Sequence, residues 1–210
     1  MMYAVKEIFK TLQGEGGQAG RTAVFLRFSG CNLWSGREED RHTAVCQFCD
    51  TDFVGMDGEN GARYRSAQEL GDKVEQVWGE DRTRRFIVCT GGEPLLQLDA
   101  AMIDELHRRG FQIAVETNGT IAAPAGLDWI CVSPKADAEL VQLTGHELKL
   151  IYPQAQCDPQ RFAHLDFGQF WLQAMDGPDL QRNLQGAIAY CLAHPQWRLS
   201  LQTHKMIGIQ

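Results

Sequence analysis

Residues 86 to 116, FIVCTGGEPLLQLDAAMIDELHRRGFQIAVE, contain the alternation that decides the fold. Phe86–Thr90 and Gln112–Glu116 are short apolar runs with the composition of buried strands. Between them, Leu98–Arg109 has the periodicity of a helix, and Gly110 ends it. Alternation of strands with helices predicts a mostly parallel sheet that helices cover.

The same alternation continues on both sides of this stretch. A capping box at Ser66 and Glu69 opens a second helix, and Asp179–His194 forms a third, which Pro195 ends. The apolar stripe of the third helix consists of Leu180, Leu184, Ile188 and Leu192. The other predicted strands are Ala23–Ser29, Trp129–Ser133, Glu147–Ile151, Phe170–Gln173 and Arg198–Gln202, with a strand-like run at Val5–Lys10 before them.

These elements bound the architecture. Roughly seven strands and three long helices are too few for a closed eight-stranded barrel, which takes about 250 residues. We therefore predict an α/β fold in which residues 1–210 form a single domain, an open and partial TIM-like barrel. Such sheets bind their ligands at the carboxyl ends of the strands, which is where candidate site residues are sought.

The composition favours a small-molecule protein. Of the 210 residues, 44% are hydrophobic and 22% are charged, and the net charge of −7 opposes binding to nucleic acid. We interpret the short basic runs Arg82-x-Arg84-Arg85 and Arg108-Arg109 as solvated surface. No apolar run is long enough for a membrane helix, and Met1–Lys10 is charged where a signal peptide is apolar. We expect a cytoplasmic protein.

The seven cysteines divide into two groups by their surroundings. Their odd number in a cytoplasmic chain does not indicate disulfides. Four of them lie in apolar strands or stand alone, namely Cys89, Cys131, Cys157 and Cys191. Cys31, Cys46 and Cys49 instead stand among glycine, polar and charged residues, where packing gives no reason for a thiol.

Two kinds of metal centre fit these three cysteines. Together with His42 they would provide four ligands for a structural zinc ion. Three thiolates without a fourth ligand instead favour a [4Fe–4S] cluster, because one iron then keeps an open position for a small molecule. We favour the cluster, and we interpret the polar segment Asn32–Val45 between the first two cysteines as a solvent-facing loop.

Polar residues follow the predicted strands. Thr90–Pro94 follows a buried strand, and we expect Gly91 and Gly92 to let a ligand approach the backbone closely. Glu116, Ser133 and Lys135 follow other strands and together suit a ribose, a carboxylate and a charged group. Near the start, Gln13 and Glu15, with Arg27, suit a planar hydrogen-bonding ring that bears a carboxylate. A plain Gly-rich turn is the alternative for this segment.

The motifs together resemble those of a known family. The cysteine triplet ending in Cys46-x-Phe48-Cys49, the Gly91–Pro94 turn and the opening Leu12–Gly16 segment are similar to motifs of the 7-carboxy-7-deazaguanine synthases, radical S-adenosylmethionine (SAM) enzymes of the queuosine pathway. The resemblance covers nearly the whole chain, from Gln13 to Lys205. It departs from the superfamily at one point: a much shorter spacer usually separates the first two cysteines, and here the spacer has fourteen residues.

The resemblance implies a fold and a reaction. The fold would be the abbreviated, open β6/α3-type barrel of radical SAM enzymes. The reaction would convert 6-carboxy-5,6,7,8-tetrahydropterin to 7-carboxy-7-deazaguanine by ring contraction with loss of ammonia, as a carbon–nitrogen lyase. A 5′-deoxyadenosyl radical, formed when the reduced cluster cleaves SAM, would start the reaction by removing hydrogen from C6 of the substrate.

The resemblance also assigns roles to particular residues. The three cysteines would hold the cluster within the loop 30–51, and Thr51 would bind a Mg²⁺ ion whose shell the substrate completes. The residues implied to bind SAM are Phe48, Cys49, Asp50, Gly92, Glu116, Ser133, Pro134, Lys135 and Gln173. Those implied to bind the pterin are Leu12, Gln13, Gly14, Glu15, Arg27, Thr90 and His204. We also expect the apolar tail to bring the α-carboxylate of Gln210 to the pterin.

The implied partners are a small pterin substrate and a flavodoxin- or ferredoxin-type reductant, and the implied assembly is a homodimer, with no nucleic acid and no membrane. Two other classes of function stay open at this point. One is an activase that installs a glycyl radical on a partner protein, which would need a protein-docking groove. The other is a non-enzymatic zinc-binding module, which iron and sulfide analysis would distinguish from a cluster protein.

Overall fold

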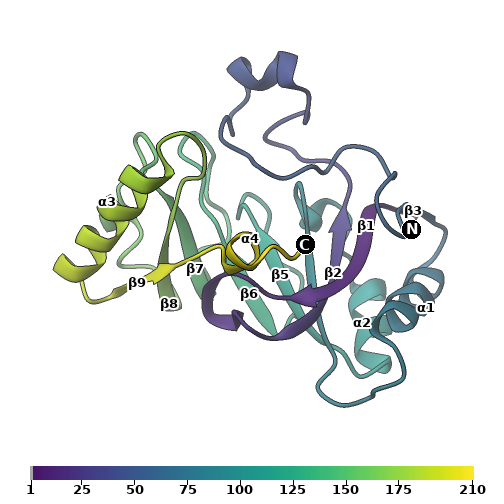
Figure 1. The fold of residues 1–210 in the computed structure, drawn as a ribbon. Coiled ribbons are helices and arrows are strands. Elements are labelled where there is room, and N and C mark those ends of the chain that lie inside the picture. Colours follow the sequence, from purple (N-terminus) through teal and green to yellow (C-terminus); the bar gives the residue numbers. More distant parts are fainter. Residues whose placement is uncertain (1) are drawn as a thin grey trace.

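One nine-stranded sheet forms the centre of the structure, a computed structural model that describes residues 2–210 (Figure 1). In spatial order the strands are β3 (Ala62–Tyr64), β1 (Tyr3–Leu12), β2 (Thr22–Phe28), β4 (Phe86–Gly91), β5 (Gln112–Thr117), β6 (Trp129–Val132), β7 (Thr144–Tyr152), β8 (Asp166–Ala174) and β9 (Trp197–Ser200). β1 pairs antiparallel with β2 and β3, and every other neighbouring pair is parallel. The sheet does not close on itself, which confirms the predicted open barrel.

Four α-helices and four 3-10 helices accompany the sheet. The α-helices are α1 (Ala67–Trp78), α2 (Ala100–Arg108), α3 (Leu180–Ala193) and α4 (Thr203–Ile207). The 3-10 helices are η1 (Gly16–Gln18), η2 (Glu38–Thr43), η3 (Pro94–Leu96) and η4 (Pro159–Arg161). α1 and α2 lie together beside one part of the sheet and α3 covers another (Figure 1). Among residues 2–210, no helix is both long and apolar enough to cross a bilayer.

Helix starts follow the capping chemistry. The Ser66 side chain accepts a hydrogen bond from the backbone N–H of Glu69, as the predicted capping box requires. α2 begins later than predicted because the Asp99 carboxylate caps it by accepting from the N–H of Met102. The residues Pro94–Leu96, just before this cap, form η3 instead of extending the helix.

The sequence predicted the wrong face of α3. Leu180 and Leu192, at the ends of the predicted stripe, are 41% and 80% exposed. The buried positions of this helix are Asn183 and Ala187, one residue before Leu184 and Ile188 respectively. The small side chain of Ala187 allows α3 to approach the sheet closely, and the Asn183 amide donates to the backbone carbonyl of Met175.

Alternation along the strands separates the two faces of the sheet. In β2, Val24 and Leu26 belong to the large core under α1 and α2, whereas Ala23 packs in a smaller cluster with Phe86 and Val88 of β4. The same period of two holds in the other strands, because successive side chains point to opposite faces. The inner face is therefore apolar near the amino ends of these strands, and polar side chains can occupy it at the carboxyl ends.

Two arginines of the predicted solvated runs are buried, so that interpretation was wrong for them. The side chain of Arg85 is 3% exposed and donates to Glu75 at 2.8 Å. Arg109, whose side chain is 6% exposed, pairs with Glu75 at 2.7 Å and with Glu105 and Asp72 at 2.6 Å. These ion pairs join α1 to α2 on the outer side of the sheet. Arg85 and Arg109 thus serve packing between helices, whereas Arg82, Arg84 and Arg108 are exposed, as predicted.

The glycine at the end of β4 gives a test of the close packing there. Gly91 has φ +145°, and a Cβ atom on it would lie 2.3 Å from the carbonyl oxygen of Phe28 in β2. We expect Gly91→Ala to lower the free energy of unfolding by about 3 kcal/mol or more, from backbone strain and overpacking together. Gly110→Ala is the matched control, since Gly110 has φ +79° with nothing within 4 Å of an added Cβ. It should cost about 1 kcal/mol in urea unfolding, and equal losses in both variants would contradict the packing argument.

Candidate active site

The inner face of the sheet becomes polar at the carboxyl ends of the strands. Residues from these ends, from the loop after β2 and from α4 line one cavity of about 360 Å³. Its volume is typical of a small-molecule site. The cavity is lined by every predicted site residue except Pro134: Leu12, Gln13, Gly14, Glu15, Arg27, Cys31, Cys46, Phe48, Cys49, Asp50, Thr51, Thr90, Gly92, Glu116, Ser133, Lys135, Gln173, His204 and Gln210. Pro134 is buried beside it, and its carbonyl accepts from Gln154 at 3.3 Å.

The three predicted ligand thiols lie at one end of this cavity. The sulfur of Cys31 accepts from the backbone N–H of Leu33 at 3.4 Å. The thiol of Cys46 hydrogen-bonds to the sulfur of Cys49, which lowers the pKa of Cys49. The same hydrogen bond, together with burial, raises the pKa of Cys46, and burial raises that of Cys31. Cys49 is therefore the one of the three thiols whose surroundings favour the thiolate, which is the ligand form of cysteine.

The zinc alternative finds no support in the geometry. Across residues 2–210, no three His, Cys, Asp or Glu side chains converge on a point where a single ion would bind. His42, the fourth ligand of that alternative, is exposed and does not line the cavity. A [4Fe–4S] cluster is much larger than one ion, so thiols spread around a cavity wall fit it better.

The glycines at the end of β4 allow close packing of the backbone. A Cβ atom on Gly92 would lie 2.3 Å from the carbonyl oxygen of Gly30 and 2.6 Å from the Cβ of Cys31. Because glycine has no side chain, the end of β4 can contact the start of the cysteine loop, residues 30–51. Glu93, which is fully buried, accepts from the hydroxyl of Thr117 and the N–H of Asn118, both at 2.8 Å, and so joins this turn to the end of β5.

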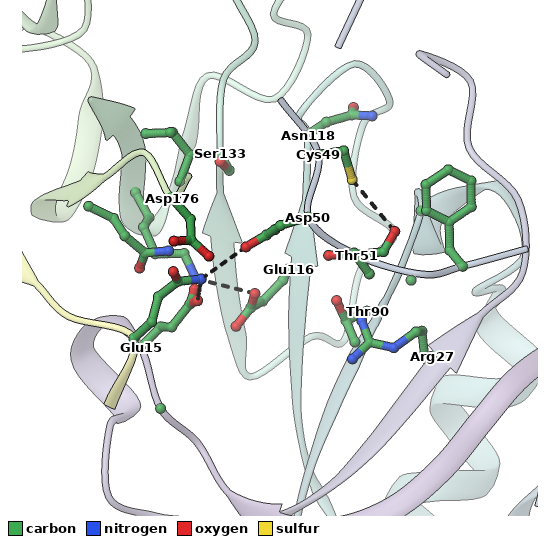
Figure 2. Close-up of a pocket in the computed structure, with 18 of the residues that line it drawn as sticks. Glu15, Arg27, Cys49, Asp50, Thr51, Thr90, Glu116, Asn118, Ser133 and Asp176 are labelled. Carbon is green, nitrogen blue, oxygen red and sulfur yellow. Dashed lines mark hydrogen bonds and ion pairs between the residues drawn. The ribbon is translucent and has the colours of Figure 1, made fainter. Parts of the chain in front are cut away.

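A buried ion-pair cluster forms the opposite end of the cavity (Figure 2). Lys149 of β7, whose side chain is 5% exposed, contacts the carboxylates of Glu15 and, at 3.2 Å, Glu116. The amide of Gln13 donates to Glu116 at 2.8 Å, and that of Gln202 donates to Glu15 at 3.0 Å. Two carboxylates that come from the turn after β1 and from β5 are thus held by one cation.

Charge balance keeps this cluster ionised. Burial is the largest single effect on the pKa of Glu15 and would raise it, but the charge and hydrogen bond of Lys149, together with the contacts of Gln202 and His204, lower that pKa. Burial would likewise lower the pKa of Lys149, but Glu116 and Glu15 raise it well above its ordinary value. Glu15 and Lys149 are therefore both charged at neutral pH and hold each other in fixed positions in the cavity.

Arg27 lies on the other side of the cavity and is positioned by Glu7. The Nε of Arg27 donates to the Glu7 carboxylate at 2.7 Å. The side-chain amide of Gln210 donates to the second Glu7 oxygen at 3.0 Å, and the backbone oxygen of Gln210 accepts from the hydroxyl of Thr11 at 2.8 Å. The segment after β9 therefore does return to the cavity.

α4 closes the gap between β9 and the turn after β1. Gly14 lacks a Cβ, and such an atom would lie 2.2 Å from the ring of His204. Lys205 bridges Asp50 of the cysteine loop and Asp176, which follows β8, at 2.6 Å each. Figure 2 shows the side chains of Asp50 and Asp176 near Glu15. The C-terminal helix thereby links the thiol end of the cavity to its ionic end.

Several of these residues were missed by the sequence analysis. Glu7 carries no motif, and only the fold brings it to the cavity; Gln202 and Lys205 follow the last predicted strand, but the sequence assigned them no role. A signal for Lys149 was present, because Glu147 and Lys149 alternate with apolar residues in an otherwise buried strand. Charged residues at every second position indicate a polar inner face.

The comparisons with known proteins agree with this site. A model of the radical SAM superfamily matches residues 42–147. The open, mostly parallel sheet carries three thiols at the carboxyl ends of its strands. Together with this family match, these features identify the chain as a radical SAM protein. The chain is 68% identical over 209 residues to the 7-carboxy-7-deazaguanine synthase of Caulobacter vibrioides and 65% identical over 210 residues to that of Bradyrhizobium diazoefficiens, with 100% of both chains covered in each case. The chain belongs to the 7-carboxy-7-deazaguanine synthase family.

A solved structure agrees with this placement. The crystal structure of QueE from Escherichia coli is 25% identical to the chain, with a TM-score of 0.71, and the match covers 96% of this chain and 94% of that one. The superfamily uses a [4Fe–4S] cluster and SAM.

The ion-pair cluster gives a test with a defined pH dependence. We expect Lys149→Met to lower the free energy of unfolding by about 3–5 kcal/mol near neutral pH, because it leaves buried carboxylates without a cation. In the wild type the lowered pKa of Glu15 makes its contribution stabilising above the unfolded pKa, with loss only in acid. In the variant burial raises that pKa, so stability should fall as the pH rises from about 5 to about 8.

The matched control is Glu15→Gln combined with Lys149→Met, which removes both charges. Urea unfolding at the two pH values should show most of the lost stability regained and little pH dependence. A double variant as unstable as Lys149→Met alone would show that charge pairing is not the cause.

Proposed function

We propose that the chain is a 7-carboxy-7-deazaguanine synthase, a radical SAM lyase of queuosine (7-deazapurine) biosynthesis. It converts 6-carboxy-5,6,7,8-tetrahydropterin to 7-carboxy-7-deazaguanine with loss of ammonia. The observation that carries this proposal is the single cavity in which three thiols meet a set of charged and amide side chains suited to a polar heterocycle. Relatives of that name at 60% identity or more along the whole chain support it.

The thiol end of the cavity is assigned to the cofactors. Cys31, Cys46 and Cys49 hold the [4Fe–4S] cluster, and the backbone of residues 48–50 and Gly92 contacts SAM. The cluster and SAM together supply a 5′-deoxyadenosyl radical when bound. SAM would extend from the thiol end toward the ionic end, and its ribose and carboxylate are bound by Glu116 of the ion-pair cluster and by Ser133, Pro134, Lys135 and Gln173. In support, the Lys135 ammonium lies 2.8 Å from the Ser133 hydroxyl and within electrostatic reach of the cluster thiols.

The ionic end of the cavity is assigned to the pterin. The substrate residues are Leu12, Gln13, Gly14, Glu15, Arg27, Thr90, His204 and the terminal carboxylate of Gln210. Glu7 binds the Nε edge of Arg27, and within residues 2–210 the Arg27 side chain makes no other hydrogen bond. Its Nη groups are therefore available for the substrate carboxylate, which arginine binds in bidentate fashion. Lys149 orients the Glu15 carboxylate as an acceptor for the ring N–H groups.

The finer properties come from the same family assignment. We propose Mg²⁺ as a further cofactor, with Thr51 as its protein ligand, since Thr51 lines the cavity beside the cysteine loop. We also propose a flavodoxin- or ferredoxin-type reductant, a cytoplasmic location and a homodimer. Exposed apolar side chains on α3 and α4, among them Leu192, Met206 and Ile207, are a surface that a second copy would cover.

The direct test is a turnover assay. The reconstituted protein is incubated under anaerobic conditions with a chemical reductant, SAM, Mg²⁺ and 6-carboxy-5,6,7,8-tetrahydropterin, and the products are identified by mass analysis. We expect a product with the mass of 7-carboxy-7-deazaguanine together with ammonia. A protein that holds the cluster and cleaves SAM but leaves the pterin unchanged would sink this proposal and favour a glycyl-radical activase.

The cysteine assignment predicts which variants lose the cluster. Cys31→Ser, Cys46→Ser and Cys49→Ser should each lose most of the bound iron and sulfide after reconstitution, because a three-thiolate cluster has no ligand to spare. Cys191→Ser is the control, since Cys191 is a half-buried thiol outside the cavity. Iron near the wild-type amount in Cys31→Ser would refute the assignment, and Cys31 is the decisive residue because of its long spacer.

The magnesium assignment predicts a separate effect. Thr51→Ala should keep the cluster and SAM binding, but the Mg²⁺ concentration that gives half-maximal turnover should rise by about tenfold. Thr43→Ala serves as the control because Thr43 is exposed on η2 and does not line the cavity. An unchanged Mg²⁺ dependence in Thr51→Ala would remove the metal role of this residue.

A further inference from the structure

The long spacer between the first two cysteines folds back on itself. The carbonyl oxygen of Leu33 accepts from the N–H of Val45 at 3.1 Å and from the N–H of Cys46 at 3.3 Å. The two ends of the segment Asn32–Val45 therefore lie side by side, and η2 forms its outer part. Most of the segment is exposed, as the sequence predicted, but Leu33 and Trp34 are buried and η2 gives the segment local helical structure. Its own packing, and not its length, sets the separation of Cys31 from Cys46.

A buried tryptophan anchors this segment. Trp34 is 7% exposed and packs edge-on against Phe53, which is 1% exposed, at a centroid distance of 5.6 Å. Its indole N–H donates to the carbonyl of Arg37 at 3.1 Å. A Cβ atom on Gly36 would lie 2.2 Å from the side chain of Val54, so the segment fits tightly against the chain after the cysteines. These contacts hold the indole ring of Trp34 in a fixed position, with one face available to a neighbouring side chain.

Arg41 of η2 stacks on the Trp34 ring and reaches the cysteine turn, Cys46–Cys49. Its guanidinium carbon lies 4.0 Å from the ring centre of Trp34. Its Nη1 donates to the carbonyl oxygens of Gln47 at 3.0 Å and Cys49 at 3.1 Å. Its Nε and Nη2 bind the two oxygens of Glu38 at 2.7 and 2.5 Å. All three nitrogens are thus engaged, which fixes the planar group in one orientation.

This geometry brings a fixed positive charge close to two of the assigned ligands. The neighbouring Glu38 and, more weakly, the charges of Cys49 and Cys46 raise the pKa of Arg41. The side chain of Glu38 is 76% exposed, so water screens its compensating charge, whereas that of Arg41 is only 27% exposed. The net effect on the cysteine turn is that of a cation.

We propose that Arg41 is a positioning residue for the cluster, one that preforms the Cys46–Cys49 turn and stabilises the reduced state of the bound cluster. The proposal rests on the proposed function, in which these cysteines are cluster ligands. The two carbonyl contacts hold the turn, so less ordering is needed when the cluster binds. Reduction adds one negative charge to the cluster, and a nearby cation favours the more negative state.

Four variants separate the hydrogen bonds from the charge. Arg41→Gln removes both, and Arg41→Lys keeps the charge but loses the planar group that bridges two carbonyls. Glu38→Gln removes the compensating charge and leaves Arg41 in place. Arg37→Gln is the matched control, because the side chain of Arg37 is 71% exposed and lies 3.9 Å from Glu39 in the same segment.

The experiment measures cluster retention and reduction potential in the reconstituted protein. Retention is the rate at which a chelator removes iron, and the potential comes from an anaerobic titration followed by electron paramagnetic resonance. For Arg41→Gln we expect severalfold faster iron loss and a more negative potential. The ratio of reduced to oxidised cluster at a fixed potential should fall about tenfold, which corresponds to about 59 mV for one electron.

The other variants should differ in a set pattern. Arg41→Lys should lose iron faster but keep a potential near that of the wild type. Glu38→Gln should shift the potential upward, by less than Arg41→Gln lowers it, because water screens part of the Glu38 charge. Arg37→Gln should change neither property. Wild-type retention and potential in Arg41→Gln would overturn the proposal. If that variant does not fold, an unchanged or lowered potential in Glu38→Gln would overturn it instead. Failure of the ligand assignment is a different result, namely Cys31→Ser with its iron intact.

Discussion

A cation buried on the inner face of the sheet organises the ionic end of the cavity. Lys149 projects from β7 into surroundings where an unpaired ammonium would be destabilised by several kcal/mol. Carboxylates must therefore accompany it, and Glu15 and Glu116 come from the turn after β1 and from the end of β5. The amides of Gln13 and Gln202 complete the cluster. One charge thus holds together parts of the chain that are more than a hundred residues apart.

The sheet could be predicted because its signal is local. A continuous apolar run such as Phe86–Thr90 indicates a buried strand without reference to the rest of the chain. The buried face of α3 could not be read in this way, because the pattern offers two adjacent stripes. Only contact with β8 and β9 selects the stripe of Ala187 over that of Leu184 and Ile188. Arg109 was misjudged for a similar reason, since two of its partners, Asp72 and Glu75, lie in another helix.

The same distinction between local signals and long-range contacts applies to the candidate site. Strand-end residues such as Glu116 and Ser133 could be predicted, because parallel strands deliver their carboxyl ends to one place. Arg41 could not, because its role depends on partners that only the folded chain brings near. For Lys149, the alternation with Glu147 indicates a polar inner face, but its partners Glu15 and Glu116 could not be predicted. The sequence singled out Gly92 for ligand access but gave no sign of its packing role. Its missing Cβ makes room for Gly30 and Cys31.

The two ends of the cavity differ in the sequence separation of their contacts. The cysteine loop closes through short-range bonds, such as that from the N–H of Cys46 to Leu33. The ionic end needs Thr203 to donate to the carbonyl of Gly14, 189 residues away, and Gly16 to donate to Ser200, 184 residues away. Loop-closure entropy delays such distant contacts during folding. A nascent or partly folded chain therefore exposes its three thiols to dissolved oxidants before the ionic end of the cavity has formed.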